Sequence, residues 1–286
     1  MENYLVLYNP YADNKHGKEN AEKLKDTLKE ASLEFVDITT IEDLEAYIKE
    51  IPEEKKLLLT GGDGTLNRFV NNVNTEEIGR DIYYCPAGSG NDFMNDVGRN
   101  EKELPIVMNK YFEKLPVVTV KGQDYKVLNG VGYGIDGYCC EVGDQQKEKN
   151  NDKINYTSIA IKGLLFYFKP VNATVIVDGV EKKFNKVWLA PTMNGRCYGG
   201  GMIPTPDQDR LSPDGTLSTL VFYGKGKLKT LMVFPSIFKG EHVKHTEMCA
   251  ILTGKEVTVR FDRPCALQVD GETILDVSEY TMRSVR

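Results

Sequence analysis

Short apolar runs alternate with helix-like segments through the first part of the chain. Runs typical of buried strands, each followed by a glycine, a proline or polar residues, occur at 4–8, 35–38, 56–60 and 82–85. Between them, apolar residues recur with the three- and four-residue spacing of helices at 21–31, 44–48 and 66–73. The threonines at 39–40 are expected to cap the second helix. This alternation predicts a parallel sheet with helices on both faces, whose ligands lie beyond the carboxyl ends of the strands.

Past residue 116 the pattern changes to short strands separated by turns. Strand-like runs occur at 117–120, 125–128, 173–177, 186–190, 217–222, 257–261 and 266–269. Asp178-Gly179 and Asp270-Gly271 have the composition of tight hairpin turns. Two apolar segments of helix length, 154–168 and 228–238, interrupt the strands. This half is predicted to be a mostly antiparallel β-sandwich.

The length of 286 residues favours two domains that share a cleft over one large domain. The change of pattern places a three-layer α/β domain at 1–118 and the β-sandwich domain at 119–286, with the last strand as a candidate to return to the first domain. The formal charge of −6 argues against nucleic-acid binding. No apolar run reaches the ~20 residues of a membrane-spanning helix.

The start of the chain has no basic leader, and the six cysteines form no C-x-x-C pair. We therefore expect a soluble cytoplasmic protein with reduced thiols and without a zinc site.

A glycine-rich turn, Gly61-Gly62-Asp63-Gly64-Thr65, follows an apolar strand and opens a helix. Residues without a Cβ let successive N–H groups approach phosphate oxygens, and the amino end of a helix favours negative charge. Asp63 would lie among phosphates only if a cation intervened, so the turn predicts a triphosphate with Mg²⁺. An ordinary strand-to-helix turn is the alternative. The spacing matches neither G-x-x-x-x-G-K-[ST] nor G-x-G-x-x-G.

A second glycine loop, Pro86-Ala87-Gly88-Ser89-Gly90-Asn91-Asp92, follows the next strand and would face the first. The two loops resemble those of the diacylglycerol kinase, sphingosine kinase and bacterial lipid kinase family, within the NAD-kinase-like superfamily. That family is marked by G-G-D-G-T with an asparagine two residues later, here Asn67, and by P-x-G-[ST]-x-N-D. Further matches in the family's order span nearly the whole chain, at 9–10, 129–136, 199–204, 214–215 and 269–272.

The resemblance implies an ATP- and Mg²⁺-dependent lipid kinase that phosphorylates the hydroxyl of diacylglycerol or a related neutral lipid. The nucleotide and its Mg²⁺ are then expected at Asn9, Thr39, Thr40, Gly61, Gly62, Asp63, Gly64, Thr65, Asn67, Gly88, Ser89, Asn91 and Asp92. A lipid alcohol needs a general base, and the D-G-E glutamate proposed for this role in bacterial relatives corresponds to Glu272. Asp63 is the second expected catalytic residue. A plain hairpin turn with an exposed acid is the alternative for Glu272.

Relatives also bind Mg²⁺ through the aspartate of a D-G turn and nearby backbone oxygens. This site corresponds to Asp214 with the carbonyls of Leu211 and Thr216, where a simple turn is the alternative. Two features depart from the family. The first loop, 9–14, lacks the usual glycine, and the family's aspartate near the start of the second domain has no counterpart in 117–121. Asp136 matches instead the acidic position of the G-F-D-A stretch in other relatives, with substrate contact or structure as its role.

The apolar segment 159–168 is expected to line an acyl-chain pocket, to touch a bilayer or to form a core helix. The expected partners are a neutral lipid and, transiently, a membrane surface, without nucleic acid; a homodimer is left open. The expected location is the cytoplasm, with peripheral membrane contact.

Two rival functions share features with this sequence. An NAD kinase shares the G-G-D-G-T turn and the domain plan, but the second loop has the lipid-kinase form and no Asn-Glu pair begins the second domain. A non-catalytic lipid- or nucleotide-binding protein on the same scaffold is the other rival.

Overall fold

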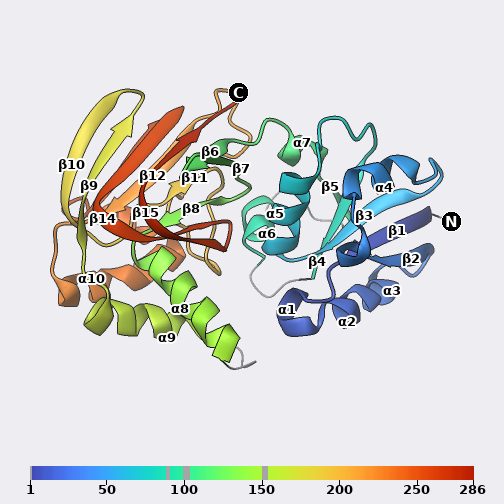
Figure 1. The fold of residues 1–286 in the computed structure, drawn as a ribbon, viewed down its shortest axis with the longest axis horizontal. Helices are drawn as coiled ribbons and strands as arrows, with labels where there is room; N and C mark the ends of the chain where they lie inside the picture. Colours follow the sequence, from blue (N-terminus) through green and yellow to red (C-terminus); the bar gives the residue numbers. More distant parts are fainter. Residues whose placement is uncertain (1, 88–90, 99–103, 150–153) are drawn as a thin grey trace. The chain divides into compact units, whose positions relative to one another are not determined.

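The computed structural model describes residues 2–87, 91–98, 104–149 and 154–286. The chain divides into two compact units, Met1–Glu113 and Lys114–Arg286. The first unit is α/β and the second is mainly antiparallel β, so the predicted fold class is confirmed (Figure 1).

A five-stranded sheet with the order β2-β1-β3-β4-β5 forms the centre of the first unit. Its strands are β1 (Glu2–Tyr8), β2 (Ala31–Asp37), β3 (Lys56–Gly61), β4 (Ile82–Pro86) and β5 (Ile106–Val107). The first four are parallel, and β5 runs antiparallel to β4. Tyr8 pairs with both Asp37 and Thr60, and Thr60 pairs with Cys85. The carboxyl ends of β1 to β4 therefore meet at one edge of the sheet.

Helices cover both faces of this sheet. They are α1 (Ala12–Lys15), α2 (Gly17–Glu22), α3 (Leu24–Thr27), α4 (Leu44–Glu50), α5 (Asp63–Asn72), α6 (Asp92–Val97) and α7 (Asn109–Phe112). In Figure 1, α1 to α3 lie below the sheet and α4 above it. Right-handed crossovers require this division for the observed strand order and put α5 on the face of α4. The central strand β3 is buried along nearly its whole length, which explains its unbroken apolar run.

Two local predictions in the first unit are wrong. The helical spacing predicted to run to residue 31 ends at Thr27, and Ala31 begins β2. The threonines at 39–40 do not cap a helix, because the Asp37 carboxylate accepts hydrogen bonds from the N–H and hydroxyl of Thr39 and closes the 3₁₀ turn η1 (Ile38–Thr40). Asp43 caps α4 instead, by accepting from the N–H of Ala46 at 2.9 Å.

The second unit contains a ten-stranded antiparallel sheet with the order β13-β12-β11-β8-β14-β15-β6-β7, and β9 and β10 branch from β14. Its strands are β6 (Val117–Val120), β7 (Gln123–Lys126), β8 (Gly130–Tyr133), β9 (Val171–Val177), β10 (Val180–Val187), β11 (Thr192–Met193), β12 (Leu217–Phe222), β13 (Cys249–Gly254), β14 (Glu256–Val269) and β15 (Glu272–Arg283). The stacked rings of Tyr133 and Phe261, 3.7 Å apart, lie in its core.

The strands predicted at 257–261 and 266–269 are one strand, β14. Its pairing with β15 shifts register between Arg260 and Leu267, so the first half of β14 can pair with β9 and the second half with β8. The last strand, β15, pairs with β14 and β6 inside the second unit. It does not return to the first sheet.

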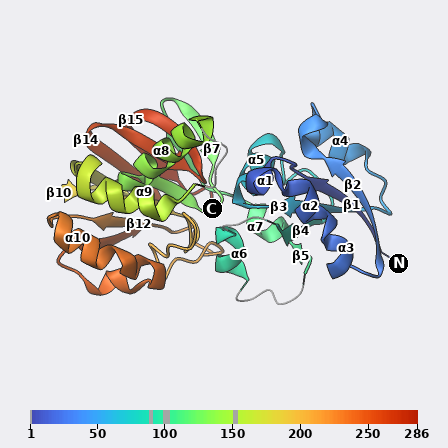
Figure 2. The ribbon, with the colours of Figure 1, turned by 90° about the horizontal axis from the view of Figure 1, so that it is seen from below.

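Helical segments cover one side of this sheet. They are α8 (Ile135–Lys149), α9 (Tyr156–Lys162), the π-helical turn η2 (Gly163–Tyr167), α10 (Lys227–Val233), η3 (Phe234–Lys239) and η4 (Glu241–Lys244). Figure 2 shows α9 and α10 next to each other, and η2 contacts α10. In the described part of the chain, none of the helices has both the length and the apolar character needed to cross a membrane.

Candidate functional site

The carboxyl edge of the first sheet collects predicted nucleotide-binding residues from four separate segments. Asn9 follows β1, Thr39 follows β2 and Gly62 follows β3, while Asp92 begins the helix after β4. The connection that leaves β1 leads to β2 on one side of it, whereas the connection that leaves β2 leads to β3 on the other side of β1. In open α/β sheets, ligands bind at such a switch point, here between β1 and β3. The sequence prediction of a shared edge is therefore borne out by the strand order and register.

Gly61 is required for close packing at the end of β3. Its carbonyl accepts hydrogen bonds from the N–H of Ala87 and from the hydroxyl of Tyr84, both at 2.8 Å. A Cβ at Gly61 would lie 2.4 Å from Oγ1 of Thr65, which is itself buried. These contacts fix the start of the glycine loop on the neighbouring strand.

Gly64 has a different environment. A Cβ placed on it would have no described atom within 4 Å, so packing within the described residues gives no reason for a glycine. Glycine destabilises a helix by ~1 kcal/mol relative to alanine. Gly64 lies in the first turn of α5, a helix of ten residues. An open first helical turn without a Cβ is the environment that a phosphate oxygen fits.

The Asp63 carboxylate joins the two glycine loops. Its Oδ2 accepts a hydrogen bond from the N–H of Asp92 at 2.9 Å, and its Oδ1 accepts from the N–H of Phe93 at 2.8 Å. The Asp63 carboxylate thus pairs with two N–H groups at the amino end of α6, which have no acceptor within their own helix. A carboxylate has about four lone pairs, so these two bonds are compatible with a role toward a cation.

The second loop is described in part. Asn91 adopts a left-handed backbone conformation with φ of +47°, and the side chain of Asp92 is buried at the start of α6. The predicted residues Gly88 and Ser89 lie outside the described residues. Asn67, predicted from the first motif, is buried in α5.

The first loop is held by contacts that the sequence did not indicate. The Asn9 side chain accepts a hydrogen bond from the N–H of Tyr11 at 2.9 Å. A Cβ on Gly17 would lie 1.9 Å from the Asn9 carbonyl oxygen, so glycine is needed where α2 packs on the loop. Asn20 donates to Asp13 at 3.0 Å and to the carbonyl of Ala87 at 3.4 Å, which links the first loop to the second.

The hydroxyls of Thr39 and Thr40 donate to Asp37, at 2.7 Å to its side chain and 2.8 Å to its carbonyl. Their contact with a nucleotide stays a prediction, although both lie at the expected edge.

In the second unit, the Asp270-Gly271 turn connects β14 to β15. Both residues have positive φ, +47° and +95°, as a tight hairpin turn requires. The Asp270 carboxylate accepts hydrogen bonds from the N–H groups of Leu128, Asn129 and Gly130, at 2.6, 2.7 and 3.0 Å. The hairpin turn is therefore present and fixed by long-range contacts. Glu272 follows it as an exposed first residue of β15, and its catalytic role stays a prediction.

Asp136 is a buried carboxylate connected to this turn. It lies in the first turn of α8, and Gln268 donates to its Oδ2 at 2.9 Å. The Gln268 side chain also accepts from the N–H of Gly271 at 2.6 Å. Burial raises the pKa of Asp136 to about 6, while Gln268 and the hydroxyl of Tyr198 lower it in part. A Cβ on Gly132 would lie 1.6 Å from Asp136, so a glycine is required beside it.

The turn predicted to hold a second metal has Asp214 exposed at its tip. The N–H of Gly215, which has φ of +65°, donates to the Ser212 carbonyl at 3.0 Å. The Thr216 carbonyl already accepts from Gln208 at 2.7 Å, and its second lone pair leaves it able to contact a cation. No group of three acidic, histidine or cysteine side chains among the described residues could hold a metal. Binding at Asp214 would therefore depend on the backbone oxygens of Leu211 and Thr216.

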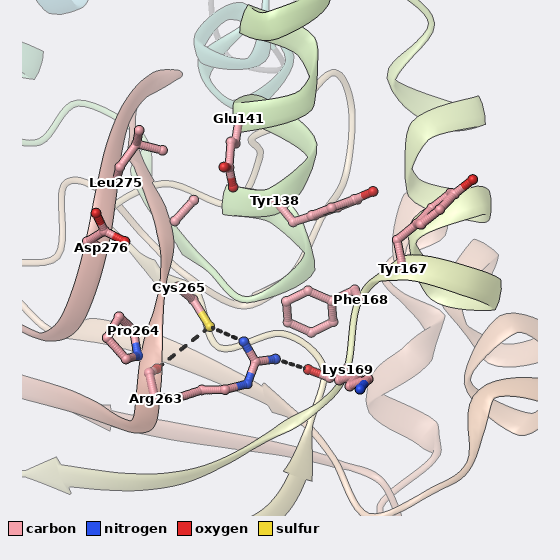
Figure 3. A pocket seen from close by; sticks show the side chains of 11 residues that line it. Tyr138, Glu141, Tyr167, Phe168, Lys169, Arg263, Pro264, Cys265, Leu275 and Asp276 are labelled. Carbon is pink, nitrogen blue, oxygen red and sulfur yellow. Dashed lines mark hydrogen bonds between the residues drawn. The ribbon is translucent and has the colours of Figure 1, made fainter.

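A surface pocket of about 590 Å³ lies elsewhere in the second unit, between α8, η2, β14 and β15 (Figure 3). None of the predicted site residues lines it. The Arg263 guanidinium donates to the Lys169 carbonyl and lies over the ring of Phe168 at 5.7 Å. Its charge is thus engaged in holding the pocket wall. Of the segment 159–168, Tyr167 and Phe168 line this pocket, and an acyl-chain pocket along the segment stays a prediction.

Comparison with known proteins gives matches over nearly the whole chain. The model of the diacylglycerol kinase catalytic domain matches residues 3–120, and the model of the YegS C-terminal NAD kinase beta sandwich-like domain matches residues 129–282. A diacylglycerol kinase of Mycobacterium tuberculosis is 28% identical over 215 residues, which are 73% of this chain and 67% of that protein. A Staphylococcus epidermidis protein whose name refers to a lipid kinase is 29% identical over 248 residues, 82% of this chain and 77% of that protein.

A crystal structure from Bacillus anthracis, named with reference to a diacylglycerol kinase, shares the fold. It superposes with a TM-score of 0.66 at 18% identity, over 100% of this chain and 93% of that chain.

Proposed function

Because the chain belongs to the diacylglycerol kinase family, we propose that this lipid kinase transfers the γ-phosphoryl group of ATP, with Mg²⁺, to the hydroxyl of diacylglycerol or a related neutral lipid. The observation that carries the proposal is the paired glycine loops, in which Asp63 binds the second loop and Gly64 leaves open space at the start of α5. This arrangement supports binding of a triphosphate at the carboxyl edge of the first sheet.

In the proposed complex, the N–H groups at the start of α5 bind phosphate oxygens, helped by the positive end of the helix dipole. Asp63 and Asp92 would hold Mg²⁺, whose chemistry is to neutralise charge on the phosphates. Asn9, Thr39, Thr40 and the remaining residues of the second loop would contact the rest of the nucleotide. The bonds from Asp63 hold the start of α6 against the first glycine turn before the nucleotide arrives, which lowers the entropy cost of binding.

Glu272 is proposed as the general base that accepts the proton of the lipid hydroxyl. It is exposed, as a group that meets an incoming substrate must be. The turn before it is held by three hydrogen bonds to Asp270 and by the bond from Gly271 to Gln268. These contacts fix the backbone from which the glutamate projects. A second Mg²⁺ at Asp214, with the carbonyls of Leu211 and Thr216, is proposed to stiffen its own turn.

The test is a labelled-ATP assay with Mg²⁺ against a panel of neutral lipids in mixed micelles, with NAD as a separate acceptor. Wild-type protein should label a lipid, and Glu272→Gln should reduce kcat by about 10² or more without a comparable change in KM for ATP. Glu148→Gln, an exposed acid on α8, is the matched control and should leave the rate unchanged. Labelling of NAD alone, or equal rates for Glu272→Gln and wild type, would contradict the proposal.

A further inference from the structure

One surface of the second unit exposes large apolar side chains side by side. We name it the apolar face and define it by Phe166 and Tyr167 of η2 and Leu228 and Met232 of α10, which are 70%, 66%, 74% and 72% exposed. The two elements touch, and Lys227 of α10 donates a hydrogen bond to the Leu165 carbonyl at 2.8 Å. Leu228 and Met232 are four residues apart, so they project from the same side of their helix. The four side chains therefore belong to one surface.

The exposed residues are not those that attach these helices to the sheet. Leu164, Phe168 and Val233, in the same two segments, are buried and belong to the core cluster beneath them. The hydrophobic effect favours removing large side chains from water, at about 25 cal/mol per Å². Because the fold is already anchored by the buried residues, the exposed ones are available to an external apolar phase.

The two segments that carry the apolar face hold charge of one sign, and the acids Glu141 and Asp276 border the pocket beside Tyr167. The segments 154–172 and 223–240 contain no aspartate or glutamate, although the chain as a whole has a formal charge of −6. Their charged residues are Lys162, Lys169, Lys225, Lys227, Lys229 and Lys239. Outside these segments, the carboxylate of Glu247 lies 3.8 Å from the ammonium group of Lys229. The apolar face thus has a lysine rim.

We propose that the apolar face docks on a bilayer whose headgroups are anionic, with the aromatic and aliphatic side chains entering the boundary between headgroups and acyl chains. Apolar insertion combined with lysine attraction is how peripheral segments bind anionic lipid. A second copy of this chain is a poorer occupant, because joining two such faces would bring two lysine rims together. The proposal does not depend on the kinase reaction, since docking is measured without ATP or an acceptor lipid.

The test is co-sedimentation of the full chain with vesicles of phosphatidylcholine alone, and of phosphatidylcholine with phosphatidylglycerol. Wild type should bind the anionic vesicles and lose binding as salt rises. Leu228→Ser with Met232→Ser should weaken binding by about tenfold or more, since both side chains lose their apolar contact with the lipid. Lys162→Gln with Lys239→Gln should weaken it by about 25-fold, at about fivefold per lysine.

Two matched controls come from the β9–β10 hairpin of the same unit. Val180 is 63% exposed, and Lys182 is also exposed. Val180→Ser therefore removes an exposed apolar side chain, and Lys182→Gln removes an exposed positive charge, at positions outside the apolar face. Both should bind vesicles as wild type does, and thermal unfolding should show every variant folded. Equal binding by the Leu228/Met232 variant and wild type would overturn the proposal. So would a wild-type dimer in light scattering that becomes monomeric in that variant, because the face would then join two copies.

Discussion

Replacing Asp136 by asparagine should stabilise the second unit at alkaline pH. The ordinary pKa of an aspartate, 3.8, is raised to about 6 in the folded protein, chiefly because burial disfavours the charged carboxylate. A raised folded pKa contributes stability that is fully present below the unfolded pKa and is lost as pH rises through the folded pKa. Above pH 6, the native protein therefore carries an ionised group in a site that prefers it neutral.

The shift is about two pKa units, and each unit corresponds to ~1.4 kcal/mol, so the penalty at pH 8 is about 3 kcal/mol. Asparagine has the same shape, no charge, and an oxygen that can still accept from Gln268. The free energy of unfolding of Asp136→Asn should exceed that of wild type by about 2–3 kcal/mol at pH 8. The difference should shrink through pH 6 and vanish near pH 4.

Urea unfolding followed by tryptophan fluorescence measures this difference. The chain has a single tryptophan, Trp188, which is buried in the unit that contains Asp136, so the signal reports on the correct part of the molecule. Glu148→Gln removes an exposed carboxylate from the same helix and should show no such pH dependence. The reasoning is refuted if Asp136→Asn is less stable than wild type at pH 8, or if the difference between the two does not change with pH.

Three further predictions concern the loops and turns. Gly61→Ala should destabilise the first unit by about 1–3 kcal/mol through its clash with Thr65, whereas Gly64→Ala should stabilise it by up to ~1 kcal/mol and weaken ATP binding. Denaturant unfolding measures the change in stability, and nucleotide titration measures the change in ATP affinity. Equal effects of the two substitutions on stability would contradict this prediction. Asp270→Ala should lower the free energy of unfolding by about 3 kcal/mol or more, because it leaves three backbone N–H groups without their acceptor. Tryptophan-monitored unfolding measures this loss, and a smaller loss would show that water replaces the carboxylate as acceptor. Mg²⁺ should raise the unfolding temperature of wild type and of Asp63→Asn, but not of Asp214→Ala, if the turn at Asp214 binds the ion.

The strands β1, β3 and β4 were readable from the sequence because each is a largely apolar run that ends at a strong breaker, whereas the two-residue strand β5 was not predicted. Gly61 at the end of β3 and Pro86 at the end of β4 are such breakers. The helix boundary at Ala31 was not readable, because alanine suits both a helix and a buried strand and the parallel pairing with Glu2 decides between them. The extent of β14 was hidden by Pro264, which signals a break that the register shift accommodates.

The candidate site was predicted in its composition but not in its contacts. The motif around Asp63 placed the residue correctly after β3, at the start of α5, yet its bonds to α6 join segments about thirty residues apart, and no local spacing encodes them. The same holds for Gln268, whose link between Asp136 and the Gly271 turn depends on the pairing of distant strands. Asn20 was not singled out from the sequence, because its contact with Ala87 exists only after the sheet forms.

The bond pattern of Asp63 also has a consequence for how the two glycine loops can change. Asp63 and the start of α6 are hydrogen-bonded to each other, so a substitution in one segment changes the stability effect of a substitution in the other. The effects of substitutions in the two loops on stability should consequently not be additive. A G-G-D-G-T turn that is transplanted into another scaffold would then need the paired Asn91-Asp92 segment as well.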